Sequence, residues 1–215
     1  MVYVDDIAVT GSNSSHVQST IKLLDDMFSI KDLGSLHFFL GAEVLQHAHG
    51  LVLTRSSFIA DLLERFGMLD ANSVSTPMST NDPLSLDDGS SSADAKLYRQ
   101  IIAKRLLRYL KGIITYGLHF TPATSFKLLA YSDADWGGIP DTRHSTFAYV
   151  ILLGNNPISW CSKKQHTVAR LSTEAEYMVV TSAVVELSWI TNLLMELHVS
   201  MSSPPKVLCD NIDAT

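Results

Sequence analysis

The spacing of apolar and polar residues over the first 71 positions predicts short strands and two amphipathic helices. Strands are expected where β-prone runs are bounded by turn residues, and helices where apolar residues recur every three or four positions. The expected elements are a hairpin over 1–10, helices over 14–28 and 58–66, and strands over 36–44 and 51–54. The first helix should turn its apolar stripe toward a core. The order of elements is therefore β-α-β-β-α.

A change in composition separates this first block from the rest of the chain. Positions 72–96 are rich in Ser, Asp, Pro and Gly, as a surface linker is, and apolar periodicity resumes as a helix over 97–111. From position 126 the pattern predicts strands over 127–133, 146–153 and 157–162, helices over 172–187 and 189–197, and a last strand over 206–209.

The predicted fold class is α/β, with an α+β first part followed by an incomplete mixed sheet with helices. The expected parts are 1–71, a linker over 72–96, a shortened helical connection over 97–125, and a last domain over 126–215 that lacks its C-terminal portion. The three tryptophans lie within apolar segments and are expected in the core: Trp136, Trp160 and Trp189.

Composition narrows the possible functions of the chain. The 215 residues are 46% apolar and 18% charged, which excludes disorder along the whole length. A net charge of −6 means that contact with nucleic acid must use local basic patches. Cys161 and Cys209 form no C-x-x-C pair, which argues against a zinc ribbon or a disulfide scaffold. No apolar run reaches the length of a membrane span, so an intracellular protein without membrane contact is expected.

Two groups of carboxylates are candidates for metal binding. Asp5 and Asp6 are expected side by side at the tip of the predicted hairpin. Asp133, Glu176 and Asp210 stand at two strand ends and a helix start that an α/β sheet brings to one edge. Each group could hold paired divalent cations for phosphodiester chemistry.

Each carboxylate also has a structural interpretation that the sequence leaves open. Aspartates such as Asp5 and Asp6 are common in tight turns, and Asp133 and Asp210 are ordinary turn or strand-exit residues. Glu176 follows Thr173 at the spacing of a capping box, in which its carboxylate would reach back to the Thr173 amide.

Basic residues gather in two places that could contact phosphates. Four share one face of the helix over 97–111, and three more precede the helix that starts at 172; they are Lys104, Arg105, Arg108 and Lys111, then Lys163, Lys164 and Arg170. A solvated helix face explains the first four equally well.

Several ordered motifs together resemble the copia-type retrotransposon Pol polyprotein. They include Tyr3-Val4-Asp5-Asp6, Ser75-Thr76-Pro77-Met78, the basic run 104–112, Ser132-Asp133-Ala134-Asp135-Trp136, and Ser172-Thr173-Glu174-Ala175-Glu176-Tyr177. The resemblance implies the end of a reverse transcriptase palm with its thumb, followed by a ribonuclease H domain. It implies catalytic and Mg²⁺-binding roles for Asp5, Asp6, Asp133, Glu176 and Asp210.

The resemblance also implies partners: a template-primer or an RNA/DNA hybrid, and other parts of the polyprotein. The loop carrying Lys163, Lys164 and Arg170 would run beside the hybrid. The chain departs from the family pattern in four ways: the third palm aspartate and the fourth nuclease carboxylate are not in this sequence, a helical stretch is deleted between 102 and 103, and Leu171 replaces a usual serine.

The leading hypothesis is a polyprotein fragment without polymerase activity, whose ancestral chemistry is RNA-directed DNA synthesis and hybrid hydrolysis with Mg²⁺. The alternatives are a weak residual ribonuclease H that uses Asp133, Glu176 and Asp210, and a non-catalytic nucleic-acid-binding or relic protein.

We expect the purified chain to extend no primer, because one carboxylate of the polymerase metal site is not among its residues. Nucleotide incorporation on a template-primer with Mg²⁺ measures this. Incorporation that is lost in Asp5→Asn would contradict the prediction.

Overall fold

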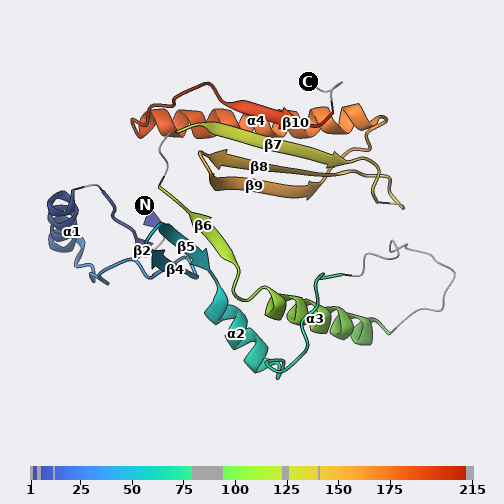
Figure 1. Cartoon of the computed structure of the whole chain (residues 1–215), viewed down its shortest axis with the longest axis horizontal. Coiled ribbons are helices and arrows are strands. Elements are labelled where there is room, and N and C mark those ends of the chain that lie inside the picture. The colour runs from blue at the N-terminus through green and yellow to red at the C-terminus, as the bar shows by residue number, and fades with distance from the viewer. Residues whose placement is uncertain are drawn as a thin grey trace.

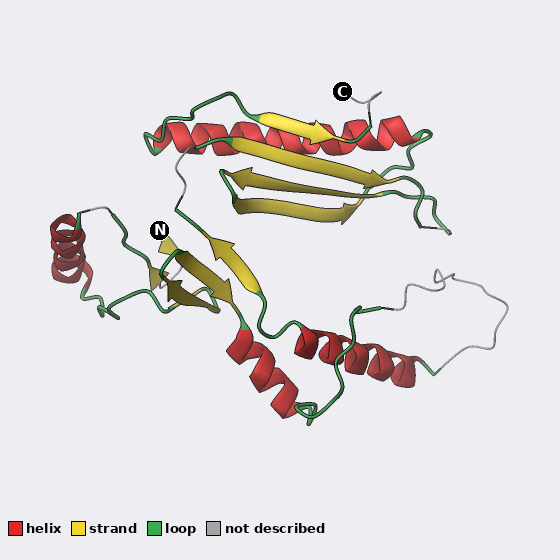
Figure 2. Cartoon of the chain, viewed as in Figure 1, coloured by secondary structure: helices red, strands yellow, loops and turns green. Residues whose placement is uncertain are grey.

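A computed structural model describes residues 2–3, 6–11, 13–78, 94–122, 126–139 and 141–211, with the backbone alone for Val2, Tyr3 and Asp6. It contains a two-stranded hairpin and two four-stranded sheets, with the orders β3-β4-β5-β6 and β10-β7-β8-β9 (Figure 1). Helices together with one antiparallel and one mixed four-stranded sheet confirm the α/β class (Figure 2).

The hairpin at the start of the chain pairs β1, Val2–Tyr3, with β2, Asp6–Ile7, in antiparallel register. Asp6 lies opposite Tyr3 within the second strand, so it is not at the tip, where the sequence placed both aspartates. Asp5 and the side chain of Asp6 lie outside the described residues. The predicted polymerase role of the pair therefore stays a prediction.

Helix α1, Ser14–Phe28, begins where predicted because the Asn13 carboxamide oxygen accepts the Ser15 and His16 amides. It ends at Ser29, whose φ of 50° is left-handed. The apolar stripe expected to face a core is only half-covered by the described residues: Val17, Ile21 and Leu24 are half-buried, none of the helix is fully buried, and Phe28 is 64% exposed. Periodicity reports an apolar face, but it does not report what covers that face.

The first sheet is antiparallel and differs from the prediction at two strands. Its members are β3, Phe38–Phe39, β4, Ala42–His47, β5, Gly50–Thr54, and β6, Gly117–Phe120. The single strand expected over 36–44 is split by a turn at Leu40 and Gly41, with φ of 52° and 74°. Strand β6 falls in the segment predicted as helical connection, and it completes this sheet by pairing with β5.

Close backbone approach explains the glycine that starts β6. A Cβ on Gly117 would lie 2.7 Å from the Leu53 carbonyl oxygen of β5.

Helices α2, Ser56–Arg65, and α3, Ala95–Gly112, pack against each other beside this sheet, and they bury Leu63 and Leu107. The two parts of α3 that the sequence suggested were fused form one continuous helix.

The second sheet holds the larger core. Its strands are β7, Leu128–Asp135, β8, Thr146–Leu153, β9, Asn156–Lys164, and β10, Lys206–Cys209. Strand β10 runs parallel to β7, whereas the β7–β8 and β8–β9 pairs are antiparallel. Helix α4, Ser172–Glu196, covers one face of this sheet (Figure 2). Ala130 and Ile151 of the sheet and Ala183 of α4 have no exposed surface.

Helix α4 is continuous where two helices were predicted. No Gly or Pro interrupts it, and Ser188, at the expected break, donates its hydroxyl to the Val184 carbonyl oxygen at 2.8 Å without leaving the helix. By length and composition alone α4 could cross a membrane, with 28% of its most apolar stretch buried. Four of its buried residues, Ala183, Leu187, Ile190 and Leu194, belong to the core cluster that includes Ala130 and Ile151 of the sheet.

The expectation that the tryptophans are core residues was wrong. Trp136, Trp160 and Trp189 are 44%, 59% and 59% exposed. Trp160 alternates along β9 with Ser159, whose hydroxyl donates to Glu186 of α4, so the indole lies on the face of the sheet that α4 does not cover.

The capping box at the start of α4 was also wrongly assigned. The N-cap is Leu171, one turn before Glu176, and Glu174 is the carboxylate that reaches back, accepting the Arg170 amide at 2.6 Å. Leu171 offers no side-chain acceptor for the first helical amides, and it is 65% exposed.

We predict that Leu171→Ser raises the free energy of unfolding by about 1 kcal/mol, because a hydroxyl at an extended N-cap accepts an otherwise unpaired amide. The backbone at Leu171 already has the required φ of −130° and ψ of 155°. Urea unfolding measures the change, and Leu171→Ala is the control. Equal stability of the two variants would show that the cap is not limiting.

Candidate acidic site at the carboxyl edge of the second sheet

The carboxyl ends of three strands meet at one edge of the second sheet. Strands β7 and β9 run in the same direction because each is antiparallel to β8, and β10 is parallel to β7. The start of α4 is tied to this edge through the segment before it: Trp136 donates its indole N–H to the Ala169 carbonyl at 3.1 Å. The buried Gln165 amide donates to the Ala175 carbonyl at 3.0 Å.

Glu176 connects helix α4 to the strand ends at this edge. Its carboxylate, only 5% exposed, accepts the Ala134 amide of β7 at 3.1 Å with Oε1, and accepts the Cys209 thiol of β10 with Oε2 at 3.4 Å. The side chain thus joins α4 to two strands. Because a buried carboxylate is stable only when donors satisfy it, these two contacts explain its position in the second turn of the helix.

The Glu176 carboxylate belongs to a group of three side chains whose atoms could bind one metal ion. One ligand atom from each of Glu176, Cys209 and Asp210 lies within 4.8 Å of the others. The sequence predicted the two carboxylates but not the thiol. Strand alternation was the available signal, because Cys209 has the same parity along β10 as Val207, which packs on the core beneath α4.

Asp133 shares the edge but not the group. Along β7 the buried Ala130 and Ser132 face α4, so the exposed Asp133 lies on the opposite face of the sheet. Among the described residues, the cluster within 4.8 Å does not include its carboxylate. The metal-binding and catalytic roles predicted for Asp133, Glu176 and Asp210 stay predictions.

Cys209 and its neighbour Ser132 are shielded from water to different degrees, Cys209 partly and Ser132 almost fully. Burial raises the pKa of the Cys209 thiol, and the Glu176 carboxylate that accepts its proton adds to the rise, so the thiol form is favoured. Ser132, the register partner of Cys209, is 7% exposed, and its Oγ makes no well-formed hydrogen bond; its hydroxyl lies near the Cys209 sulfur, where it opposes the rise in the pKa of that thiol.

The predicted basic loop borders this edge. Lys163 and Lys164 end β9, and Arg170 precedes α4; all three are exposed. Lys164 donates to the Thr142 hydroxyl at 3.1 Å. Their predicted contact with nucleic acid is compatible with these positions and stays a prediction.

Basic side chains of α3 form hydrogen bonds within the protein. They fasten the segment 69–78 onto the helix, while Lys104 is exposed. Arg105 donates to Thr76 Oγ1 at 3.0 Å, Arg108 donates to the Asn72 carbonyl oxygen at 2.6 Å, and Lys111 donates to the Leu69 carbonyl oxygen. Phosphate binding by these cations would have to compete with these contacts.

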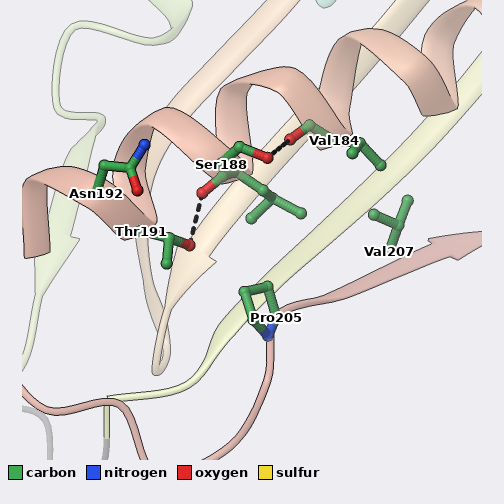
Figure 3. A pocket seen from close by; sticks show the side chains of 7 residues that line it. Val184, Ser188, Thr191, Asn192, Pro205 and Val207 are labelled. Carbon is green, nitrogen blue, oxygen red and sulfur yellow. Dashed lines mark hydrogen bonds between the residues drawn. The ribbon is translucent and has the colours of Figure 1, made fainter. Parts of the chain in front are cut away.

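A groove of about 360 Å³ lies away from the acidic edge, between the second half of α4 and the start of β10. Figure 3 shows Ser188 and Thr191 in it, and both hydroxyls donate to carbonyls of their own helix. Its lining residues are Val184, Leu187, Ser188, Thr191, Asn192, Pro205 and Val207. The lining has no titratable side chain, so the acidic edge remains the candidate for chemistry.

Comparisons with known proteins agree with the resemblance seen in the motifs. Residues 1–80 match the family model described as reverse transcriptase (RNA-dependent DNA polymerase). The chain is 39% identical over its whole length to the retrovirus-related Pol polyprotein from transposon RE2 of Arabidopsis thaliana, of which it spans 17%. It is 28% identical over its whole length to the Pol polyprotein from transposon TNT 1-94 of Nicotiana tabacum, of which it spans 19%.

A shorter relative is matched almost from end to end. It is the uncharacterized mitochondrial protein AtMg00810 of Arabidopsis thaliana, 34% identical over 88% of this chain and 92% of its own. No solved structure matches the chain.

We predict that Glu176→Gln speeds alkylation of Cys209. The carboxylate raises the pKa of the thiol, so removing its charge lowers that pKa and increases the thiolate fraction at any pH below it. Iodoacetamide labelling near pH 8, in a Cys161→Ser background, measures the rate. Glu186→Gln, which neutralises a glutamate of the same helix that contacts β9, is the control. Equal rates in the two variants would contradict the assigned role of Glu176.

Proposed function

The chain belongs to the copia-type retrotransposon Pol polyproteins and carries reverse transcriptase sequence, and from this membership we propose that its second sheet is a ribonuclease H-like module that binds an RNA/DNA hybrid without cleaving it efficiently. The chain spans 17% of the Pol relative from transposon RE2. What the whole polyprotein does is therefore itself a proposal for this chain.

The proposal rests on one observation: the Asp133 carboxylate is separated from those of Glu176 and Asp210. Ligand atoms of Glu176 and Asp210 lie within 4.8 Å of each other, in a group that does not include Asp133, whose side chain strand alternation turns away from α4. Two-metal hydrolysis needs carboxylates that bridge cations about 4 Å apart. A pair of carboxylates with the third turned away is not such a cradle, and the loss of one member of a catalytic set lowers the rate by orders of magnitude.

The donor set at the edge also differs from what paired Mg²⁺ ions require. Magnesium takes oxygen ligands in octahedral geometry. Glu176 and Asp210 supply oxygens, but the third atom of the group is the Cys209 sulfur. These residues do not fit a pair of Mg²⁺ ions, so no hydrolytic step is assigned to them.

The proposed contact with the hybrid uses the basic border of the same edge. Lys163, Lys164 and Arg170 are exposed beside the ends of β9 and α4, where they would meet phosphates of the hybrid backbone. Because the chain as a whole is acidic, binding depends on this local patch and weakens steeply with salt.

The proposed assignment of segments to modules keeps the boundaries predicted from the sequence. We assign 126–215 to the ribonuclease H-like module and 1–71 to the polymerase palm and thumb remnant, with 72–125 as linker and helical connection. Strand β6 lies within that connection yet pairs with β5, which supports a structural role for it in the first part. Other segments of the polyprotein are the proposed protein partners.

We expect a triple Ala variant at Lys163, Lys164 and Arg170 to bind a hybrid duplex about tenfold more weakly than the parent. The salt slope should be smaller by about 2–3, since each phosphate that a cation neutralises adds near 0.9 to it. Fluorescence anisotropy measures both. The matched control replaces three exposed lysines elsewhere, Lys22, Lys127 and Lys206, for the same change in net charge. An equal weakening in the control variant would reduce the effect to overall charge.

The same preparation tests cleavage. We expect no hybrid hydrolysis with Mg²⁺ beyond that of a buffer control. The second candidate function is a weak ribonuclease H, favoured by the proximity of Glu176 and Asp210. Mg²⁺-dependent cleavage that Asp133→Asn abolishes would establish it and overturn the non-catalytic assignment.

A further inference from the structure

We propose that Glu176, Cys209 and Asp210 form a site for a single thiophilic divalent cation of the Zn²⁺ class. The proposal takes up the mismatch between this donor set and Mg²⁺. The metal site stands on the geometry of these side chains alone, and only its consequence for nucleic acid rests on the proposed function.

The spacing of the ligand atoms suits such an ion. Zinc bonds thiolate sulfur at about 2.3 Å and carboxylate oxygen at about 2.0–2.2 Å, which puts two ligand atoms of a tetrahedral site roughly 3.5 Å apart. The Cys209 sulfur and Glu176 Oε2 are already 3.4 Å apart, and the whole group lies within 4.8 Å. Small rotations of the Asp210 side chain, which is exposed at the strand end, complete the approach.

A second feature points to a ligand at this place. The Ser132 hydroxyl is buried and makes no well-formed hydrogen bond, and it lies beside the sulfur of Cys209, with which Ser132 is paired in the β7–β10 ladder. Both side chains lie on the face of the sheet toward α4. A buried hydroxyl without a well-formed hydrogen bond is destabilising. A cation on the neighbouring sulfur, or water in its fourth coordination position, supplies the missing partner.

The chemistry of the donors sets the preference for metal. Soft thiolate selects Zn²⁺ and similar ions over Mg²⁺, and the two carboxylates neutralise the charge that binding brings in. Binding releases the thiol proton to solvent and replaces the hydrogen bond between Cys209 and Glu176 by shared coordination. If the module binds a hybrid as proposed, the ion would lie at the edge that the basic loop borders.

The test is a titration of the full chain with Cd²⁺, because a cadmium–thiolate bond gives an ultraviolet charge-transfer band that carboxylates do not. We expect one equivalent to produce the band in the parent chain. We expect Cys209→Ser to lose it and Cys161→Ser, which removes the other cysteine of the chain, to keep it. Glu176→Gln and Asp210→Asn should each weaken Cd²⁺ binding at least tenfold, and Ser132→Ala several-fold.

Thermal unfolding with and without Zn²⁺ checks that the variants are folded. We expect Zn²⁺ to raise the melting temperature of the parent and of Cys161→Ser, but not that of Cys209→Ser. A band that survives in Cys209→Ser, or one that disappears in Cys161→Ser, overturns the proposal. So does a parent chain that unfolds cooperatively yet gives no band. The optical readout is independent of hybrid binding, so failure of the metal site and failure of the proposed function are distinguishable.

Discussion

The buried carboxylate of Glu176 is the interaction on which the acidic edge depends. It takes an amide from β7 and a thiol from β10, and so it fixes the start of α4 against the ends of two strands. A charged group at 5% exposure needs such donors, because desolvation without them costs several kcal/mol. The apolar contacts around Ala130, Ile151 and Ala183 hold the helix on the sheet, and this contact sets where along the sheet it begins.

The same geometry determines which side chains can meet at this end of the sheet. Side chains alternate along β7, so Ser132 and Asp133 face opposite sides of the sheet. Glu176 approaches from the side of Ser132, where the neighbouring strand offers a sulfur. The ligand set is therefore decided by strand parity as well as by which acidic residues are present.

Sequence reasoning was strongest where local pattern and tertiary structure agree. The strands β7, β8 and β9 and helices α1, α2 and α3 were predicted because their periodicity persists over several residues. It failed where contacts between residues distant in the sequence determine the structure. Strand β6 exists because β5 pairs with it, Glu176 bonds β7 and not its own helix start, and Trp160 lies on a sheet face that no described helix covers. Likewise Cys209 enters the site only through the β7–β10 register.

The alternation of half-buried and exposed residues along β10 favours that register. Val207 packs on the core beneath α4, whereas Leu208 and Lys206 face away from it. A slip of β10 by one residue would turn Lys206 and Leu208 toward α4 and move Val207 out of the core, and the cost of burying the Lys206 ammonium opposes it. The same slip would turn the Cys209 sulfur away from Glu176. The placement of a soft ligand beside two carboxylates is thus a consequence of how the strand buries its valine, and it persists as long as that packing does.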